Sequence, residues 1–320
     1  MLTGAEDAEA VRRIPDVMFA ERDSGRLRAD LVLPRGSGPW PTIVWLHGGG
    51  WFTGDRTLAP DLGRYFAARG FAMASIEYRL SGTASFPAQL HDVRSAVRFL
   101  RRNAARFGID PGAMGLWGSS AGGHLAALTA VTGHLPVLDG EPREAGDAGV
   151  QAVSEGYGPV DLAAVVAAAA PDSPLVGEQA PEARLLGGPP AERAELAAQA
   201  SPLTYVSAAA PPFQILHGTA DVLVPDSQSA ALHTALSAAD VESTLYLLDG
   251  FRHGFLNPAG RIELDGPKVM DDGRLEAEPG TPARFWHARP GHAEDSGVEP
   301  VSFSAIGDFF AQHLQGQGKA

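Results

Sequence analysis

Short runs of apolar and β-branched residues alternate with longer segments of helical periodicity along most of this sequence. Three of the runs, at residues 42–46 (TIVWL), 71–77 (FAMASIE) and 113–117 (AMGLW), have the length and composition of buried strands. Between them, residues 62–69 and 87–107 repeat apolar side chains at helical spacing. A parallel sheet with crossover helices produces this alternation, so the sequence predicts an α/β fold.

The second half of the chain continues the same pattern. Residues 150–156, 213–217 and 243–248 are strand candidates, and residues 226–239 have helical periodicity between the last two. No internal repeat is visible in the sequence. We therefore expect residues 1–320 to form a single domain on one doubly wound, mostly parallel sheet flanked by helices.

Three segments depart from the alternation. Residues 16–21 and 27–33, joined by the turn sequence DSG, predict an antiparallel hairpin at the sheet edge. Residues 157–212 contain Pro- and Ala-rich helical pieces, which we interpret as a cap-like insertion over the carboxyl ends of the strands. Residues 258–300 are rich in Pro, Gly and charge, and precede a final helix at 302–314. We expect this irregular insertion to be a lid, an interface arm that builds a homodimer, or a disordered segment.

Charge and composition exclude several classes of function. The chain has 38 acidic and 25 basic residues and a net charge of −13, which disfavours binding to nucleic acid and to anionic membranes. It contains no cysteine, so disulfides, thiolate metal sites and a cysteine nucleophile are excluded. No apolar run is long enough to span a bilayer. The first residues lack a basic region followed by an apolar run, so we expect a cytoplasmic protein.

A G-x-S-x-G motif lies between a predicted strand and a predicted helix. Its sequence is GSSAGG, from Gly118 to Gly123, with Ser120 as the candidate nucleophile. A serine on a sharp strand-to-helix turn projects its hydroxyl from the sheet, and small neighbours are needed to avoid clashes there. The alternative is a Gly-rich turn chosen only for tight packing. The flanking strand and helix favour the catalytic interpretation.

A serine hydroxyl needs a base that is held by an acid. In this arrangement the chain order is Ser, then Asp or Glu, then His, each following a strand. Asp221 follows the strand at 213–217 and is our candidate acid. Asp226 competes with it, although its place before a helix is typical of an N-cap.

The candidate base is His253, which follows the strand at 243–248 in the sequence GFRHGF. His287 and His292 are its competitors, and both lie in the irregular segment where neither follows a predicted strand. We expect both to be exposed histidines.

Three consecutive glycines follow the strand at 42–46 in the sequence HGGGW. Glycines allow the backbone to present N–H groups to a cavity without obstruction, as an oxyanion hole requires. Gly48, Gly49 and Ala121 are the candidate donors of this hole. The alternative is a flexible turn without a catalytic role. The serine motif and the ordered acid and base favour the oxyanion hole over this alternative.

Several longer motifs accompany these residues. They are HGGGW from residue 47, EYRL from 77, FPAQLHDVRSAVRFL from 86, FGIDP from 107, GSSAGGHLAAL from 118, YGPVDL from 157, ASPLTYV from 200 and HGTADVLVP from 217. Together they resemble the bacterial feruloyl-esterase-like branch of the α/β-hydrolase fold and, more distantly, the hormone-sensitive-lipase-like carboxylesterases. The resemblance covers residues 15–257 and the last helix.

The resemblance implies the same triad and oxyanion hole, and it implies that Tyr78 and Arg79 are structural. Two features depart from it. Ser119 stands before the nucleophile where lipase-like relatives carry an acidic residue, and residues 258–300 have no recognised counterpart. The first weakens the lipase-like assignment, and the second leaves substrate and partners open.

These observations predict a serine hydrolase that cleaves a small-molecule carboxylic ester through an acyl-enzyme, without a metal or an organic cofactor. Alternatives with the same triad are action on an amide, thioester or lactone, and acyl transfer or cyclisation. A catalytically silent binding protein of this fold is the alternative from a different class. Such proteins have lost one of the three triad residues, and this sequence keeps all three.

Overall fold

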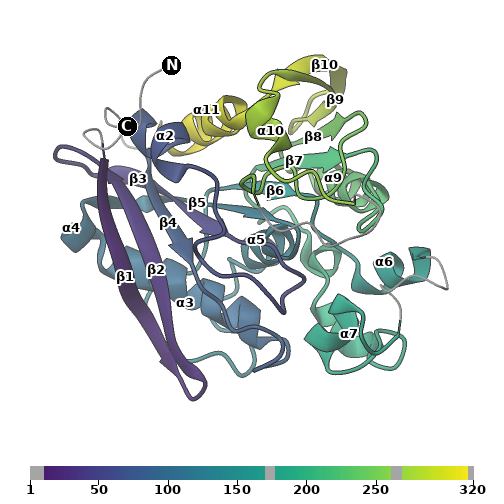
Figure 1. Ribbon diagram of the computed structural model, residues 1–320, viewed down its shortest axis with the longest axis horizontal. Coiled ribbons are helices and arrows are strands. Elements are labelled where there is room, and N and C mark those ends of the chain that lie inside the picture. The colour runs from purple at the N-terminus through teal and green to yellow at the C-terminus, as the bar shows by residue number, and fades with distance from the viewer. Residues whose placement is uncertain (1–10, 170–176, 261–268, 316–320) are drawn as a thin grey trace.

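The computed structural model describes residues 11–169, 177–260 and 269–315 (Figure 1). Within these ranges ten strands form one sheet, in the order β1-β2-β4-β3-β5-β6-β7-β8-β9-β10. The strands are β1 (Val11–Arg22), β2 (Gly25–Pro34), β3 (Trp40–Leu46), β4 (Ala72–Ile76), β5 (Ile109–Ser119), β6 (Ala152–Gly156), β7 (Phe213–Gly218), β8 (Ser243–Leu248), β9 (Thr281–Ala288) and β10 (Asp295–Val301).

The central strands from β4 to β8 are parallel to their neighbours, and the pairs at both edges of the sheet are antiparallel. This confirms the predicted mostly parallel α/β sheet. The helices are α2 (Leu62–Tyr65), η1 (Ala67–Arg69), α3 (Ala88–Arg102), α4 (Ala104–Phe107), α5 (Ala121–Val131), α6 (Leu162–Ala168), α7 (Pro181–Leu186), α8 (Ala194–Gln199), η2 (Pro202–Tyr205), α9 (Ser227–Ala238), α10 (Arg274–Ala277) and α11 (Phe303–Leu314). None of the helices in the described ranges has the length and apolar character needed to cross a membrane.

Helices cover both faces of the sheet because successive strand residues point to opposite sides. In β3, Val44 and Leu46 belong to one apolar core, with residues of α3, α5 and α9. Ile43 and Trp45 belong to the other core, with residues of α2 and α11. All four side chains are fully buried. The continuous apolar run TIVWL therefore reflects a strand that is buried on both faces.

The N-terminal hairpin is present as predicted. β1 pairs antiparallel with β2, and β2 pairs antiparallel with β4, so the hairpin lies at one edge of the sheet (Figure 1). The predicted helix at 87–107 is interrupted at Asn103, where α3 ends and the short helix α4 begins.

The expectation of an irregular segment at residues 258–300 is wrong for its second part. β9 pairs antiparallel with β8, and β10 pairs with β9, so this hairpin extends the sheet at its other edge (Figure 1). Both strands contain proline, and β10 is largely exposed, so the alternation of apolar and polar residues is weak. β10 is the edge strand, and an edge strand tolerates such a sequence because one of its sides needs no partner. Residues 261–268 lie outside the described residues.

Four short helices, α6 to α8 and η2, lie within residues 157–212, where the sequence predicts a cap-like insertion. In Figure 1, α6 and α7 lie apart from the helices that cover the sheet. Residues 170–176 lie outside the described residues. The N-terminal end of α7 reaches the glycine loop after β3, as described below.

Candidate active site

Ser120 occupies a sharp turn between β5 and α5. Its backbone has a φ of 55° and a ψ of −122°, in a region that residues other than glycine rarely adopt. The turn requires glycine two positions before and two positions after it. A Cβ atom on Gly118 would overlap the backbone of Gly122, and one on Gly122 would overlap the carbonyl oxygen of Leu46. The glycines of the motif are therefore needed for close backbone packing, and the strained serine is the residue that they expose.

The structure brings the three predicted triad residues together. The Nε2 atom of His253 lies 2.7 Å from the Oγ atom of Ser120. The Nδ1 atom of His253 lies 2.6 Å from Oδ2 of Asp221. An ionised carboxylate can only accept, so Nδ1 carries the proton and Nε2 is left to accept the hydrogen bond of the serine hydroxyl. This is the arrangement in which a histidine can remove the proton of a serine.

Asp221 is buried and hydrogen-bonded on both oxygens. Its Oδ1 atom accepts from the backbone amides of Leu223 and Val224, at 2.9 and 3.0 Å. Burial by itself would raise the pKa of Asp221, but the charge of His253 and hydrogen bonds from His217 and His253 lower that pKa well below its usual range. The carboxyl group therefore stays ionised and fixes the orientation of the histidine ring.

The competing residues lie elsewhere. Asp226 directly precedes α9, although its side chain makes no capping hydrogen bond. His292 is exposed, as predicted, and its Nδ1 atom lies 2.8 Å from the carbonyl oxygen of Pro290. The expectation that His287 is exposed is wrong, because it is half-buried in β9 with its Nε2 atom 3.5 Å from Glu242. The sequence did not predict β9, so the position of His287 beside Glu242 was not predicted either.

The predicted oxyanion residues Gly48, Gly49 and Ala121 line the same cavity as Ser120. Gly49 has a φ of +117°, and its carbonyl oxygen accepts from the amides of Phe52 and Thr53, which closes a tight turn. A Cβ atom on Gly48 would lie 3.3 Å from the Cβ of Ser120. In the described part of the chain, no group accepts a hydrogen bond from the amides of Gly48, Gly49 or Ala121. Three amides of residues that line the cavity with Ser120 thus have no acceptor within the described part of the chain, as the donors of an oxyanion hole require.

Two contacts fix this glycine loop. Tyr78 stacks on the His47 ring with a centroid distance of 4.4 Å, and its hydroxyl donates to the His47 carbonyl oxygen at 2.8 Å. The indole of Trp51 donates to Nδ1 of His124 at 3.1 Å, and Nε2 of His124 lies 2.7 Å from the carbonyl oxygen of Ala200. Burial lowers the pKa of His124 to about 4, so the ring is neutral and donates through Nε2. Sequence analysis assigned no role to His124.

The structural role that the family resemblance implies for Arg79 agrees with its contacts. Its guanidinium group makes two hydrogen bonds to the carboxylate of Asp92, at 2.7 and 2.9 Å. Asp92 is fully buried in α3, so this pair attaches the loop after β4 to that helix.

The loop that carries His253 is attached to the turn that carries Ser120. The Ser119 hydroxyl donates to Oδ1 of Asn257 at 3.1 Å, and Nδ2 of Asn257 donates to Oδ1 of Asp272 at 2.8 Å. The amide of Asp271 donates to the His253 carbonyl oxygen at 2.7 Å. The first part of the unusual C-terminal insertion therefore supports the histidine loop. Asn257 was missed because nothing in the sequence relates it to a residue 138 positions away.

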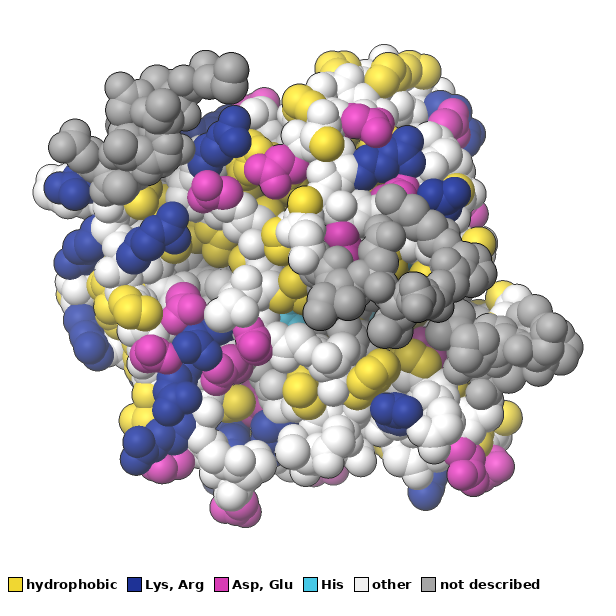
Figure 2. All heavy atoms as spheres, viewed as in Figure 1, with side chains coloured by type: hydrophobic (Ala, Val, Ile, Leu, Met, Phe, Trp, Pro, Cys, Tyr) yellow, Lys and Arg dark blue, Asp and Glu magenta, His cyan; other side chains and the backbone are white. Residues whose placement is uncertain are grey.

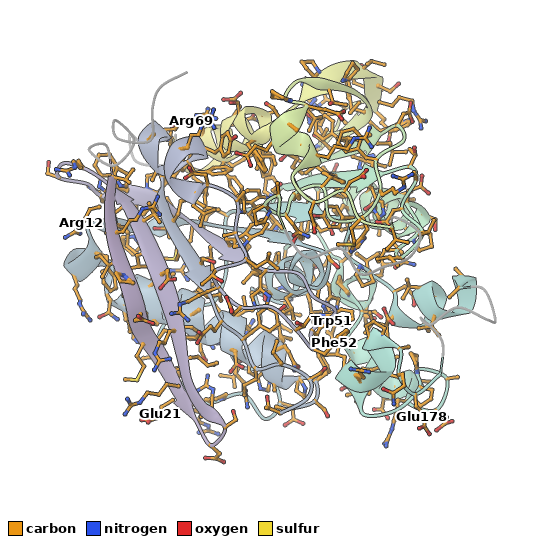
Figure 3. The ribbon with its side chains drawn as sticks, in the orientation of Figure 1. Arg12, Glu21, Trp51, Phe52, Arg69 and Glu178 are labelled. Carbon is orange, nitrogen blue, oxygen red and sulfur yellow. The ribbon has the colours of Figure 1, made fainter. Side chains whose placement is uncertain are left out.

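A cavity of about 280 Å³ opens at Ser120. Figure 2 shows histidine atoms near the centre of this face of the molecule, among hydrophobic side chains. Figure 3 places Trp51 and Phe52 at the end of the glycine loop, beside α7. The lining combines Ser120, His253 and the candidate oxyanion residues with apolar side chains and one acid; its members are Gly48, Gly49, Gly50, Trp51, Phe52, Thr53, Ser120, Ala121, Pro159, Pro181, Glu182, Leu223, Val224, His253, Asn257 and Met270.

No group of three or more His, Asp or Glu side chains within residues 11–169, 177–260 and 269–315 is placed to hold a metal ion. The donors of the site are instead backbone amides, and its reactive groups are a hydroxyl and an imidazole. The arrangement can attack an electrophilic carbonyl and hold the oxyanion that results.

Comparisons with known proteins agree with this geometry. The model of the BD-FAE family matches residues 29–236. Esterase LipQ of Mycobacterium tuberculosis is 34% identical over 218 residues, which are 67% of this chain and 50% of that protein. The chain thus spans about half the length of the curated relatives it matches.

Solved structures show the same fold over a larger share of the chain. A truncated carbohydrate esterase from gut microbiota is 27% identical with a TM-score of 0.72, and the match covers 96% of this chain and 97% of that one. Propionate-bound esterase Est2 of Thermogutta terrifontis is 26% identical with a TM-score of 0.61, over 79% of this chain and 88% of that one. The chain therefore belongs to the BD-FAE family of α/β-hydrolase esterases.

Proposed function

We propose that the protein hydrolyses small carboxylic esters by two-step acyl transfer, with Ser120 as nucleophile, His253 as general base and acid, and Asp221 as the group that orients His253. The observation that carries this proposal is the continuous hydrogen-bonded row from Asp221 through His253 to Ser120 at the floor of a cavity. Membership of a family of esterases supports the choice of an ester as substrate.

In the first step Nε2 of His253 takes the hydroxyl proton of Ser120 while Oγ forms a bond to the ester carbonyl carbon. The electron pair of the carbonyl double bond moves to its oxygen, where the amides of Gly48, Gly49 and Ala121 stabilise the negative charge. The bond to the alcohol then breaks, and His253 gives its proton to the departing oxygen. In the second step the same histidine deprotonates a water molecule, which attacks the acyl group and releases the acid and Ser120.

The size of the cavity supports a short acyl group. A volume of about 280 Å³ is at the lower end of the range for small-molecule sites. Structures of Thermogutta terrifontis esterase 2 are propionate-bound and butyrate-bound, and both ligands are short-chain carboxylates. We infer that acetyl to butyryl esters fit this cavity better than long-chain esters do.

The test is to compare turnover of p-nitrophenyl acetate, butyrate and laurate by the wild-type protein and by Ser120→Ala. We expect the short esters to be turned over faster than laurate, and the variant to lose on the order of 10³-fold or more of the activity. A fluorophosphonate probe should label the wild-type protein on the peptide that contains Ser120. Equal turnover by the wild-type protein and the variant would exclude the proposed mechanism.

A further inference from the structure

Glu182 lies in the wall of the cavity that contains Ser120, and the proposed mechanism does not use it. It is the second residue of α7, and only 7% of its surface is exposed. Among the residues that the structure describes, no group of another residue hydrogen-bonds to its carboxyl group, and the donor near it is its own backbone N–H. Burying a carboxyl group without a partner is unfavourable, so a role in binding would explain its position.

No cation in the cavity compensates Glu182. The described lining contains no lysine or arginine, and its other ionisable side chain, His253, is already bonded to Ser120 and Asp221. Arg184, two residues further along α7, lies over the Phe52 ring at 4.7 Å and donates to Gln179. Burial consequently raises the pKa of Glu182 to about 7.

The helix that carries Glu182 packs directly against the oxyanion loop. A Cβ atom on Gly50 would lie 3.3 Å from the Cβ of Pro181, the residue before Glu182. The contact between Phe52 and Arg184 lies at the same junction, and Figure 3 shows Phe52 beside α7. An ester held by Ser120 and the oxyanion donors would therefore occupy the cavity that Glu182 lines.

We propose that Glu182 is a specificity-determining residue, which accepts a hydrogen bond from a hydroxyl or ammonium group on the acyl or alcohol part of the ester. This proposal rests on the proposed esterase function. A ligand that donates a hydrogen bond to a carboxyl group without a partner removes the cost of leaving that group unbonded. A hydrogen bond that involves a charged group is also stronger than one between neutral groups. Esters that carry a donor are thus preferred over apolar esters of the same shape, and esters that carry a carboxylate are disfavoured.

The experiment compares matched pairs of esters in two series, one varying the alcohol part and one the acyl part. In each series a terminal methyl group is replaced by a hydroxyl, and a terminal isopropyl group by a dimethylammonium group. The value of kcat/KM is measured at pH 8 for the wild-type protein, Glu182→Met and Glu182→Gln. Glu178→Met is the matched control, because Glu178 is an exposed acid shortly before α7 (Figure 3).

We expect the wild-type protein to prefer the donor-bearing member of at least one pair by on the order of 10-fold, and Glu182→Met to abolish that preference. Glu182→Met should lower kcat/KM for the donor-bearing member of the pair more than for its apolar partner. Glu178→Met should keep both the preference and the turnover of the apolar esters. Glu182→Gln distinguishes the two donors, since it retains an acceptor for a hydroxyl but has no charge for an ammonium group.

The proposal is wrong if the wild-type protein shows no preference in either series, or if Glu182→Met changes kcat/KM for both members of every pair by the same factor. Failure of the proposed function would look different, because Ser120→Ala would then retain activity on the apolar esters.

Discussion

The Ser119 hydroxyl donates a hydrogen bond of 3.1 Å to the side chain of Asn257, and thereby links the residue before the nucleophile to the loop that follows His253. Both side chains are buried. The bond explains why a serine, rather than the acidic residue of lipase-like relatives, is compatible with this position. It fixes the turn that carries Ser120 relative to the loop that carries His253. A small shift between them would disturb proton transfer from Ser120 to His253.

A double-mutant cycle tests this link. Ser119→Ala should lower kcat by about 10-fold, because the buried hydrogen bond to Asn257 is lost. Asn257→Leu should lower kcat by at least as much, because it removes that bond and the bond to Asp272. The double variant should be no slower than the slower single variant, since both changes remove the same contact. Rates are measured with p-nitrophenyl acetate and corrected for the fraction of active protein. Effects that multiply in the double variant would contradict a shared role.

The assignment of the acid can be tested with two matched substitutions. Asp221→Asn preserves the shape of the side chain but removes the charge that fixes the protonated Nδ1 of His253. We expect kcat to fall by on the order of 10⁴-fold, as expected when a triad histidine is held in the wrong tautomer. Asp226→Asn, which changes an acid that makes no capping hydrogen bond, should leave kcat unchanged. A larger loss in the second variant would transfer the role to Asp226.

The backbone geometry of the nucleophile turn predicts a strong effect of one methyl group. In Gly122→Ala the new Cβ atom would overlap the carbonyl oxygen of Leu46, which no side-chain rotation can relieve. We expect the free energy of unfolding to fall by roughly 3 kcal/mol or more. Gly82→Ala is the control, because its Cβ would meet nothing within 4 Å. Urea unfolding of both variants gives the comparison, and equal stability of the two would contradict the close packing described above.

The buried neutral His124 predicts a pH-dependent stability. Burial lowers its pKa to about 4 in the folded protein, whereas the unfolded chain has the ordinary value of 6.5. Between these values the unfolded state binds more protons, so the contribution of His124 is present above pH 6.5 and is lost as the pH falls toward 4. Glu155 and Glu182, whose pKa values burial raises to about 7, give the opposite slope.

The difference between the wild-type protein and His124→Gln isolates the histidine. From pH 7 to pH 4.5 the wild-type protein should lose roughly 2 to 3 kcal/mol more of its unfolding free energy than the variant does. Urea unfolding at the two pH values provides the measurement. If the wild-type protein and His124→Gln lose the same amount, then His124 is not the neutral buried group that the geometry indicates.

Much of the sheet could be predicted because its central strands are buried on both faces and appear as continuous apolar runs. The β9–β10 hairpin could not. Its edge strand β10 is satisfied on one side by solvent, and β9 is only partly buried, so neither needs a continuous apolar run or strict alternation. Deleting residues 259–297 would be a suitable test if this segment were only a lid or an interface arm. In the structure, that deletion would remove β9 and part of β10 from the sheet.

The sequence by itself predicted the candidate nucleophile, acid and base that the structure brings together, and the glycine loop beside them. Each of these is a local signal, in which a residue type follows directly after a strand, and parallel strands end at one edge of a sheet. Only the tertiary structure decided which distant side chains support and surround them. Asn257 bonds to Ser119, and Glu182 lines the cavity that contains Ser120. Both contacts arise from the packing of loops and short helices that are far apart along the chain, so no periodic pattern in the sequence indicates them. Contacts of that kind depend on how the elements pack in three dimensions, and local residue patterns do not encode this packing.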